Sequence, residues 1–259
     1  MNMYRGTPFD LSGRSALVTG GGRGLGKEMA RLLAIAGAEV AVCSRTAAEI
    51  EATARELANE AGVRVEALVA DVGKRPEAER LARDATERLG KIDILISNAG
   101  WNIPQPLDGI SDQDWDALLE LNLTSSMVLT RALAPGMMQR GWGRIIYISS
   151  VMGLASAPDR VAYSTTKAAL LGMVRANALR LGPHGVTANC LAPGPFATDF
   201  TSSRLTAQQR ESFAARTAVG RWGEPAELAP AALLLASPAG SYITGAVLVV
   251  DGGATARMW

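Results

Sequence analysis

Short apolar runs alternate with longer amphipathic segments along most of the chain. Runs that are apolar on both faces predict buried strands, and the amphipathic segments predict helices. Strands are expected at Ser15–Thr19, Glu39–Cys43, Val65–Val69, Ile92–Ser97, Arg144–Ser149, Val186–Leu191 and Ala246–Val250. Helices are expected at Leu25–Ile35, Ala47–Ala61, Pro76–Leu89, Asp112–Met138, Tyr163–Leu181 and Glu224–Ala236.

This alternation predicts a single α/β domain over residues 1–259, a doubly wound, seven-stranded parallel sheet of the Rossmann type with helices on both faces. The longest helical stretch contains Pro135, where a bend is expected. Ligands of such sheets bind at the carboxyl ends of the strands, near the point where the strand order reverses. The loops that follow the strands are therefore where functional residues are expected.

The loop after the first strand is rich in glycine and leads directly into a helix. Its spacing is Gly20-x-x-x-Gly24-x-Gly26. Glycine lets the backbone turn tightly and approach a pyrophosphate closely, and the helix N-terminus offers free N–H groups. No Lys-Ser or Lys-Thr pair follows, which argues against an ATP-binding loop. A dinucleotide is expected on Gly20, Gly22, Arg23, Gly24, Leu25 and Gly26, with an ordinary strand-to-helix turn as the alternative.

The end of the second strand indicates which dinucleotide binds. An acidic residue usually stands there to accept from the ribose of NAD, but this strand ends in Ser44 and Arg45. Arg45 offers a cation to the 2′-phosphate of NADP, and Arg23 could join it. Asp71, followed by Val72, could accept from the adenine amino group or cap the next helix. We predict NADP (NADPH) rather than NAD; the alternative is that both arginines are ordinary solvated charges.

Composition and charge exclude several other classes of protein. Apolar residues make up 48% of the chain and charged residues 20%, as in a soluble globular protein. The net charge of +1 gives no sign of a nucleic-acid partner. No apolar run approaches the roughly 20 residues of a membrane span, and no secretory signal is visible. Cys43 and Cys190 lack metal-ligand spacing and are expected to be buried free thiols, so we expect a cytoplasmic protein without a metal.

Tyr163 and Lys167 lie four residues apart in a predicted helix and share one face. The pKa of a tyrosine is ordinarily about 10, and a nearby ammonium or an oxidised nicotinamide would lower it. Such a tyrosine can take a proton from an alcohol or give one to a carbonyl oxygen. Ser150, at the end of the fifth strand, could hold the substrate oxygen. Ser149 is its rival, and strand alternation sends the two to opposite sides.

With these segments in this order, the chain resembles the short-chain dehydrogenase/reductase family over nearly its whole length. The matching segments are Thr19-Gly20…Gly24…Gly26, Asp71-Val72, Asn98-Ala99-Gly100, Asn122, Ser150, Tyr163-x-x-x-Lys167, Asn189 and Pro193-Gly194. The resemblance implies that Tyr163 is the acid/base, that Lys167 lowers its pKa and binds the nicotinamide ribose, and that Ser150 orients the substrate oxygen. Asn122 would support a water-linked proton relay to Lys167.

Further cofactor contacts and an assembly follow from the same resemblance. It implies that Asn98, Ala99 and Gly100 line the cofactor, and that Pro193, Gly194, Phe196 and Thr198 flank the nicotinamide. Ser97 departs from the family, which usually has an asparagine there. The resemblance also implies a homotetramer, in which the helices Asp112–Met138 and Tyr163–Leu181 pair across one two-fold axis and the last strand meets its mate at another.

Two segments resemble the gluconate 5-dehydrogenase branch and its sugar-acid relatives. These are Phe9-Asp10-Leu11-Ser12-Gly13 and Arg221-Trp222-Gly223-Glu224. The segment Trp101–Pro106 has no arginine for a carboxylate, which speaks against gluconate itself. Apolar residues that follow strands are expected to line the pocket for a small carbonyl or alcohol substrate, and Phe196–Phe213 is expected to form a lid. These apolar residues are Trp101, Met152, Leu154, Phe196 and Phe200.

The predicted function is NADP(H)-dependent interconversion of a ketone and a secondary alcohol. One alternative is enoyl-thioester reduction on the same fold, against which the four-residue Tyr163–Lys167 spacing speaks, because that chemistry normally uses a longer one. Another is a cofactor-binding regulatory or scaffold protein without turnover. The presence of Asn122, Ser150, Tyr163 and Lys167 together speaks against that alternative.

Overall fold

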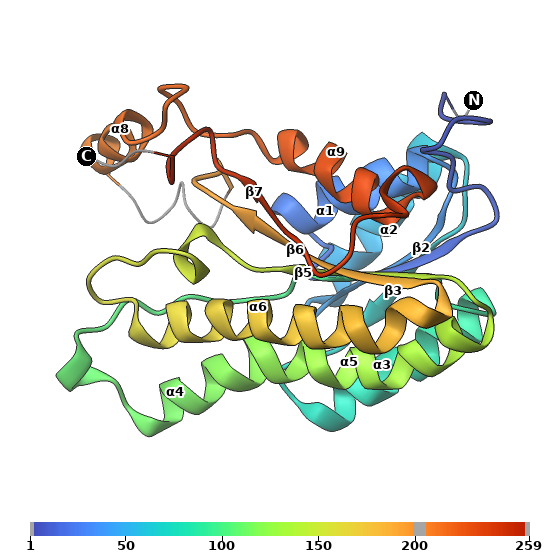
Figure 1. Cartoon of the computed structure of the whole chain (residues 1–259), viewed down its shortest axis with the longest axis horizontal. Helices are drawn as coiled ribbons and strands as arrows, with labels where there is room; N and C mark the ends of the chain where they lie inside the picture. The colour runs from blue at the N-terminus through green and yellow to red at the C-terminus, as the bar shows by residue number, and fades with distance from the viewer. Residues whose placement is uncertain (1–2, 199–205, 257–259) are drawn as a thin grey trace.

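A parallel sheet of seven strands, in the order β3-β2-β1-β4-β5-β6-β7, forms the centre of the molecule (Figure 1). The computed structural model describes residues 3–198 and 206–256. The strand order reverses between β1 and β4, as in a doubly wound sheet, so the predicted fold class is confirmed. The strands are β1 (Ser15–Thr19), β2 (Glu39–Ser44), β3 (Val65–Val69), β4 (Ile94–Ser97), β5 (Gly143–Ile148), β6 (Val186–Pro193) and β7 (Val247–Val250).

Helices cover both faces of the sheet. Helices α1, α2 and α9 lie on one face, and α3, α4, α5 and α6 lie on the other (Figure 1). At the end of the sheet where α6 begins, the chain also forms α8. Their bounds are α1 (Gly24–Ile35), α2 (Ala47–Ala61), α3 (Arg75–Leu89), α4 (Asp112–Leu119), α5 (Ser125–Gln139), α6 (Val161–Leu181), α8 (Ala207–Ala215) and α9 (Pro225–Ala236).

Alternate residues of each central strand pack into two separate hydrophobic cores, one on each face of the sheet. In β1, Ala16 and Val18 contact the core beneath α1 and α9, whereas Leu17 contacts the core beneath α3, α5 and α6. All three side chains are fully buried. Full burial of a leucine-sized side chain stabilises the fold by about 1.5–3 kcal/mol. The sheet therefore forms a firm platform, and its carboxyl edge holds the loops that carry the candidate site.

The predicted helix Asp112–Met138 is interrupted, but not where it was expected to be. Pro135 lies inside α5, which continues beyond it to Gln139. The interruption is instead a π-helical turn at Glu120–Thr124, which joins α4 to α5. Helix α5 is thus continuous through the proline, and the wider turn forms around Asn122, which is buried. Such π-turns are frequent at functional sites.

Part of the predicted lid is helical. Helix α8 begins after Thr206, whose hydroxyl accepts from the N–H of Gln209 while the Gln209 side chain accepts from the N–H of Thr206. This reciprocal cap is encoded by Thr-x-x-Gln and could have been found in the sequence. Phe200 and the rest of segment 199–205 lie outside the described residues.

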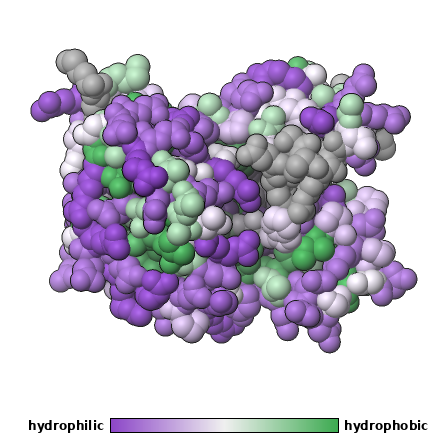
Figure 2. Space-filling model, turned by 180° about the vertical axis from the view of Figure 1, so that it is seen from behind, coloured by the Kyte–Doolittle hydropathy of each residue, from purple (hydrophilic) through white to green (hydrophobic). Residues whose placement is uncertain are grey.

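The face of the molecule seen in Figure 2 is mainly hydrophilic, with apolar residues in small groups. Ion pairs join neighbouring helices at the surface; Arg31 on α1, for example, contacts Glu56 and Glu60 on α2. Cys43 and Cys190 are buried and free, as predicted. Within the described ranges, we find no helix with the length and apolarity needed to cross a membrane.

Candidate active site

The glycine loop after β1 is folded so closely that side chains would not fit. Gly20 and Gly24 have positive φ angles of 64° and 55°, which favour glycine. A Cβ on Gly26 would collide with the carbonyl of Gly20 and would lie 2.5 Å from Asn98 Nδ2. The N-terminus of α1 follows without a side-chain cap and without an acidic residue in its first turn. This loop fits the pyrophosphate of a dinucleotide, which needs close backbone approach and free N–H groups.

Residues after β4 hold the glycine loop in place. Asn98 Nδ2 donates to the carbonyls of Thr19 and Gly20 at 2.9 and 3.2 Å. Thr19 Oγ1 accepts from the backbone N–H groups of Asn98 and Ala99, both at 3.0 Å. The predicted cofactor residues of two neighbouring strands are thus brought together at the switch point. Ser97, the departure from the family, is buried with its hydroxyl 2.8 Å from that of Ser126.

The loops after β2 and β3 place the residues predicted to contact the adenosine. Ser44 ends β2, and the side chain of Arg45 beyond it is exposed. Asp71 Oδ1 accepts from the N–H of Gly73 at 3.1 Å. Because helix α3 starts after Lys74, Asp71 forms a tight turn and is not the cap of that helix. Val72 beside it is buried.

The loop after β6 faces the glycine loop. A Cβ on Gly24 would lie 3.4 Å from Thr198 Cγ2, which places residues far apart in sequence side by side. Phe196 is buried and pairs with Gly223 in an isolated parallel bridge. Gly194 donates its N–H to Val250 and has no room for a side chain, because a Cβ would lie 2.5 Å from that of Asp251. Pro193 is the last residue of β6.

Tyr163 and Lys167 lie on the first turns of α6, directly beside the end of β5. Tyr163 is half-buried, and Ser150 lies close enough to its phenol to lower the pKa of that phenol. The Lys167 ammonium is buried, donates to the carbonyl of Ile148 at 2.8 Å and lies 5.7 Å from the centre of the Tyr163 ring. Ser149 is turned away, because its hydroxyl donates to the Lys167 carbonyl at 2.8 Å. Strand alternation thus separates the two serines and places Ser150 at the tyrosine.

Burial dominates the electrostatics of this pair. It lowers the pKa of Lys167 to about 8. It also raises the pKa of Tyr163, although the nearby Ser150 hydroxyl and the charge of Arg160 act in the opposite direction. The sequence predicted a lowered pKa for Tyr163 from the nearby ammonium. In this structure the pKa is raised, because desolvation of the phenol outweighs its polar neighbours.

Asn122 connects this pair to the loop after β4. Its Oδ1 accepts from the N–H of Trp101 at 2.8 Å, and its Nδ2 donates to the Trp101 carbonyl at 2.9 Å and to Thr166 Oγ1 at 3.2 Å. A Cβ on Gly100 would lie 3.1 Å from Asn122 Oδ1 and 3.3 Å from Lys167 Nζ. Both polar groups thus border one small space. Thr166 was missed by the sequence analysis, although its position beside Lys167 on the predicted helix was a signal.

Comparisons with known proteins agree with this geometry. Residues 20–255 match a family model described as Enoyl-(Acyl carrier protein) reductase. Gluconate 5-dehydrogenase of Gluconobacter oxydans is 38% identical over 96% of this chain and 98% of its own. The 3-oxoacyl-[acyl-carrier-protein] reductase of Aquifex aeolicus is 35% identical over 94% of this chain and 98% of its own.

A solved structure shares the whole architecture. The gluconate 5-dehydrogenase from Burkholderia cenocepacia, crystallised in complex with NADP and tartrate, is 36% identical and has a TM-score of 0.92. The alignment covers 97% of this chain and 98% of that one. Because a family model matches residues 20–255 and both sequence and fold match relatives over nearly the full length, the chain belongs to the short-chain dehydrogenase/reductase family of oxidoreductases.

Proposed function

We propose that this protein interconverts a ketone and a secondary alcohol with NADP(H), using Tyr163 as the acid/base. One observation carries the proposal: Tyr163, Ser150 and Lys167 converge at the carboxyl end of β5, and Asn122 borders the same space. A phenol close to a serine hydroxyl and to a buried ammonium is suited to proton transfer at a substrate oxygen. The same arrangement argues against a protein that only binds a cofactor.

In the direction of reduction, Tyr163 gives its phenolic proton to the carbonyl oxygen, and Ser150 donates a hydrogen bond to that oxygen as negative charge develops. The cofactor, when bound, supplies the hydride, or accepts it in the reverse direction. Lys167 stabilises the phenolate with its positive charge. Asn122 Oδ1 and Lys167 Nζ border the space through which a water would return the proton to the site.

The cofactor proposed is NADP(H). Arg45 stands at the end of β2 where NAD-binding sites usually have an acid, and Arg23 lies in the adjoining glycine loop. A guanidinium binds a phosphate through charge-assisted hydrogen bonds. A family member with 36% identity was crystallised with NADP, which supports the choice.

Carbonyl reduction is preferred to enoyl reduction despite the description of the matching family model. The four-residue spacing of Tyr163 and Lys167 on α6 places the phenol at Ser150, which suits a carbonyl or hydroxyl oxygen. Sugar acids and 3-oxoacyl thioesters are the first substrates to try, because relatives of both kinds share more than a third of their residues with this chain. Turnover of these substrates is followed by the absorbance of NADPH. An enoyl thioester is tested in the same assay, and its reduction would favour the alternative function.

A homotetramer is the assembly we propose. Helices α5 and α6 present partly exposed apolar side chains away from the sheet, such as Met127 and the largely exposed Leu179. Apolar residues on the outer side of two long neighbouring helices are suited to pairing with a second copy. Strand β7 is the last strand of the sheet and offers its free edge to another copy.

Replacing Tyr163 with phenylalanine tests the proposal directly, because it removes the transferable proton and keeps the ring. We expect turnover to fall by at least about 100-fold, the scale of a general acid/base contribution, with NADPH binding largely retained. Tyr242→Phe is the matched control, since that side chain is fully exposed. A Tyr163→Phe enzyme with more than about a tenth of wild-type turnover would exclude this role for the tyrosine.

A further inference from the structure

One face of α2 is packed against the glycine loop. Thr53 is buried, and its hydroxyl donates to the carbonyl of Gly22 at 2.8 Å. Glu49 lies one helical turn earlier and therefore on the same face. A Cβ on Gly22 would collide with the carboxylate of Glu49, whose Cδ and Cγ would lie 3.1 and 3.2 Å away. The Glu49 carboxylate thus lies against the loop that is proposed to bind the cofactor.

Glu49 also contacts one of the two arginines proposed for the 2′-phosphate. Its Oε2 lies 3.8 Å from Arg23 Nε. The Glu49 side chain is 32% exposed and that of Arg23 is 64% exposed, so this ion pair is partly open to solvent beside the glycine loop. Arg45 is exposed and forms no ion pair or hydrogen bond with other side chains of the described segments. The part of the site proposed for the 2′-phosphate therefore contains two cations, Arg23 and Arg45, and one carboxylate, that of Glu49.

We propose that Glu49 is a specificity-determining residue that weakens the preference for NADP and lets the site accept NAD. Its charge opposes a 2′-phosphate and competes for Arg23, whereas a carboxylate is the usual acceptor for the free ribose hydroxyl of NAD. The acid that is missing from the end of β2 is thus supplied from the first turn of α2. This inference rests on the cofactor site proposed above.

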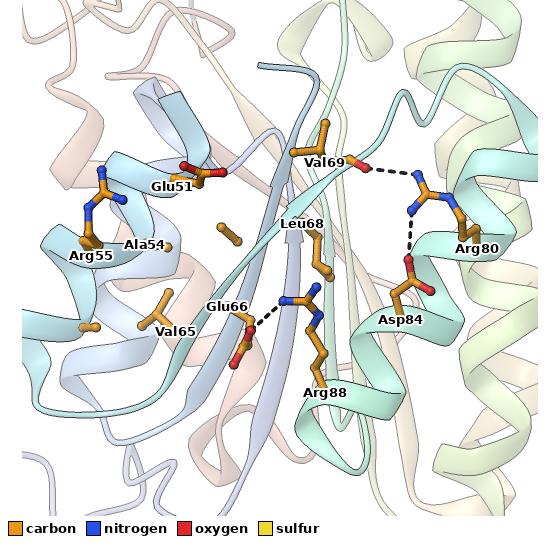
Figure 3. A pocket seen from close by; sticks show the side chains of 12 residues that line it. Glu51, Ala54, Arg55, Val65, Glu66, Leu68, Val69, Arg80, Asp84 and Arg88 are labelled. Carbon is orange, nitrogen blue, oxygen red and sulfur yellow. Dashed lines mark hydrogen bonds and ion pairs between the residues drawn. The ribbon is translucent and has the colours of Figure 1, made fainter. Parts of the chain in front are cut away.

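A purely structural role for Glu49 makes a different prediction, because a carboxylate in the first turn of a helix also stabilises the helix dipole. Glu51 provides the comparison. It lies on the same helix but points into a different groove, between α2 and β3, together with Arg55 and Val65 (Figure 3). Glu51→Gln therefore removes the same charge close to the same helix end without touching the glycine loop.

The test is to measure the dissociation constants of NADPH and NADH by protein fluorescence for wild type, Glu49→Gln and Glu51→Gln. We expect Glu49→Gln to bind NADPH about three- to tenfold more tightly, and to bind NADH equally well or more weakly. Glu51→Gln should leave the ratio of the two constants unchanged. Because solvated charges are screened, the gain in Glu49→Gln should shrink at about 0.5 M salt.

Three outcomes would overturn the inference. The first is a ratio of the NADPH and NADH dissociation constants in Glu49→Gln that lies within about 1.5-fold of the wild-type ratio. The second is an equal change of this ratio in Glu51→Gln, which would make the effect one of overall charge. In both, the wild type still binds nucleotide, so the proposed function survives. The third is a wild type that binds neither cofactor, which would overturn the proposed function as well. Thermal unfolding of both variants establishes that each is folded under the binding conditions.

Discussion

Gly100→Ala would test the proposed proton relay by placing one methyl group between two of its members. The methyl carbon would stand 3.1 Å from Asn122 Oδ1 and 3.3 Å from Lys167 Nζ. Gly100 does not belong to the glycines with positive φ, so the backbone accepts alanine. The substitution therefore fills the space between the amide and the ammonium, where a water would join them, and leaves both groups in the protein.

The expected magnitude follows from how firmly the two neighbours are held. Asn122 makes three hydrogen bonds, and Lys167 Nζ is bound to the Ile148 carbonyl. Contacts of 3.1 and 3.3 Å are relieved by small shifts, and glycine-to-alanine changes at compatible sites stabilise by about 0.4–1 kcal/mol. Stability should thus stay within about 1 kcal/mol of wild type. Loss of the relay should lower kcat by about 10- to 100-fold, part of a general acid/base contribution.

The assay is steady-state turnover with saturating cofactor, together with a fluorescence titration of NADPH. Gly182→Ala serves as the control, because that glycine has a φ of −53° and its new methyl group would have no neighbouring heavy atom within 4 Å. A Gly100→Ala enzyme whose kcat stays within about twofold of wild type would refute the relay at this position. A loss that appears entirely as weaker NADPH binding would refute it too, since the relay acts after binding.

Three further predictions concern the cofactor, a buried charge and the assembly. Arg45→Ala should reduce kcat/KM with NADPH by about ten- to a few hundredfold, the value of one charge-assisted contact, and leave NADH nearly unchanged; equal losses with both would make Arg45 structural. Burial lowers the pKa of Lys167 from 10.5 to about 8. Between these pH values the folded state binds fewer protons than the unfolded state, so the free energy of unfolding should rise with pH across that window. In urea unfolding, the stability of wild type relative to Lys167→Met should therefore increase by up to about 3 kcal/mol from pH 8 to 10.5, and a flat difference would contradict the burial argument. Light scattering at micromolar concentration should give the mass of four chains, and a monomer mass would exclude the proposed tetramer.

The sheet could be predicted from the sequence because its strands are buried on both faces. Ile94, Leu95 and Ile96 are apolar in succession, and each is fully buried, with alternate residues in the two cores. A strand that is apolar at every position is stable mainly where both of its faces are buried, as in the centre of a parallel sheet. The interruption of the helix at Glu120–Thr124 left no comparable signal, since the helix breakers of the predicted stretch are Pro135 and Gly136, and α5 accommodates both.

The candidate site likewise has features that could be predicted from the sequence and features that could not. Tyr163 and Lys167 were predicted to share a face because helical spacing fixes it, and the hydrogen bond of Ser149 to the Lys167 carbonyl follows from strand alternation. The contact of Glu49 with the glycine loop depends on how α2 packs against α1 and β2. That is a tertiary relation, which one-dimensional periodicity does not contain. The direction of the Tyr163 pKa was missed for a similar reason, because burial is set by elements remote in sequence.

The proposed catalytic groups and the loops after β4 and β5 are held by different means. Lys167 and Asn122 are fixed by hydrogen bonds to main-chain groups of β5 and of the loop after β4. The loops after β4 and β5 are joined to each other by the N–H of Gln105, which donates to the carbonyl of Asp159, and Gln105 Nε2 donates to Asp114 of α4 at 2.6 Å. Asp159 has a φ of 61°, uncommon for a residue with a side chain. A substitution that altered this contact would displace both loops together and leave Lys167 and Asn122 in place, so we expect changes of substrate in this protein to arise from pairs of loop residues.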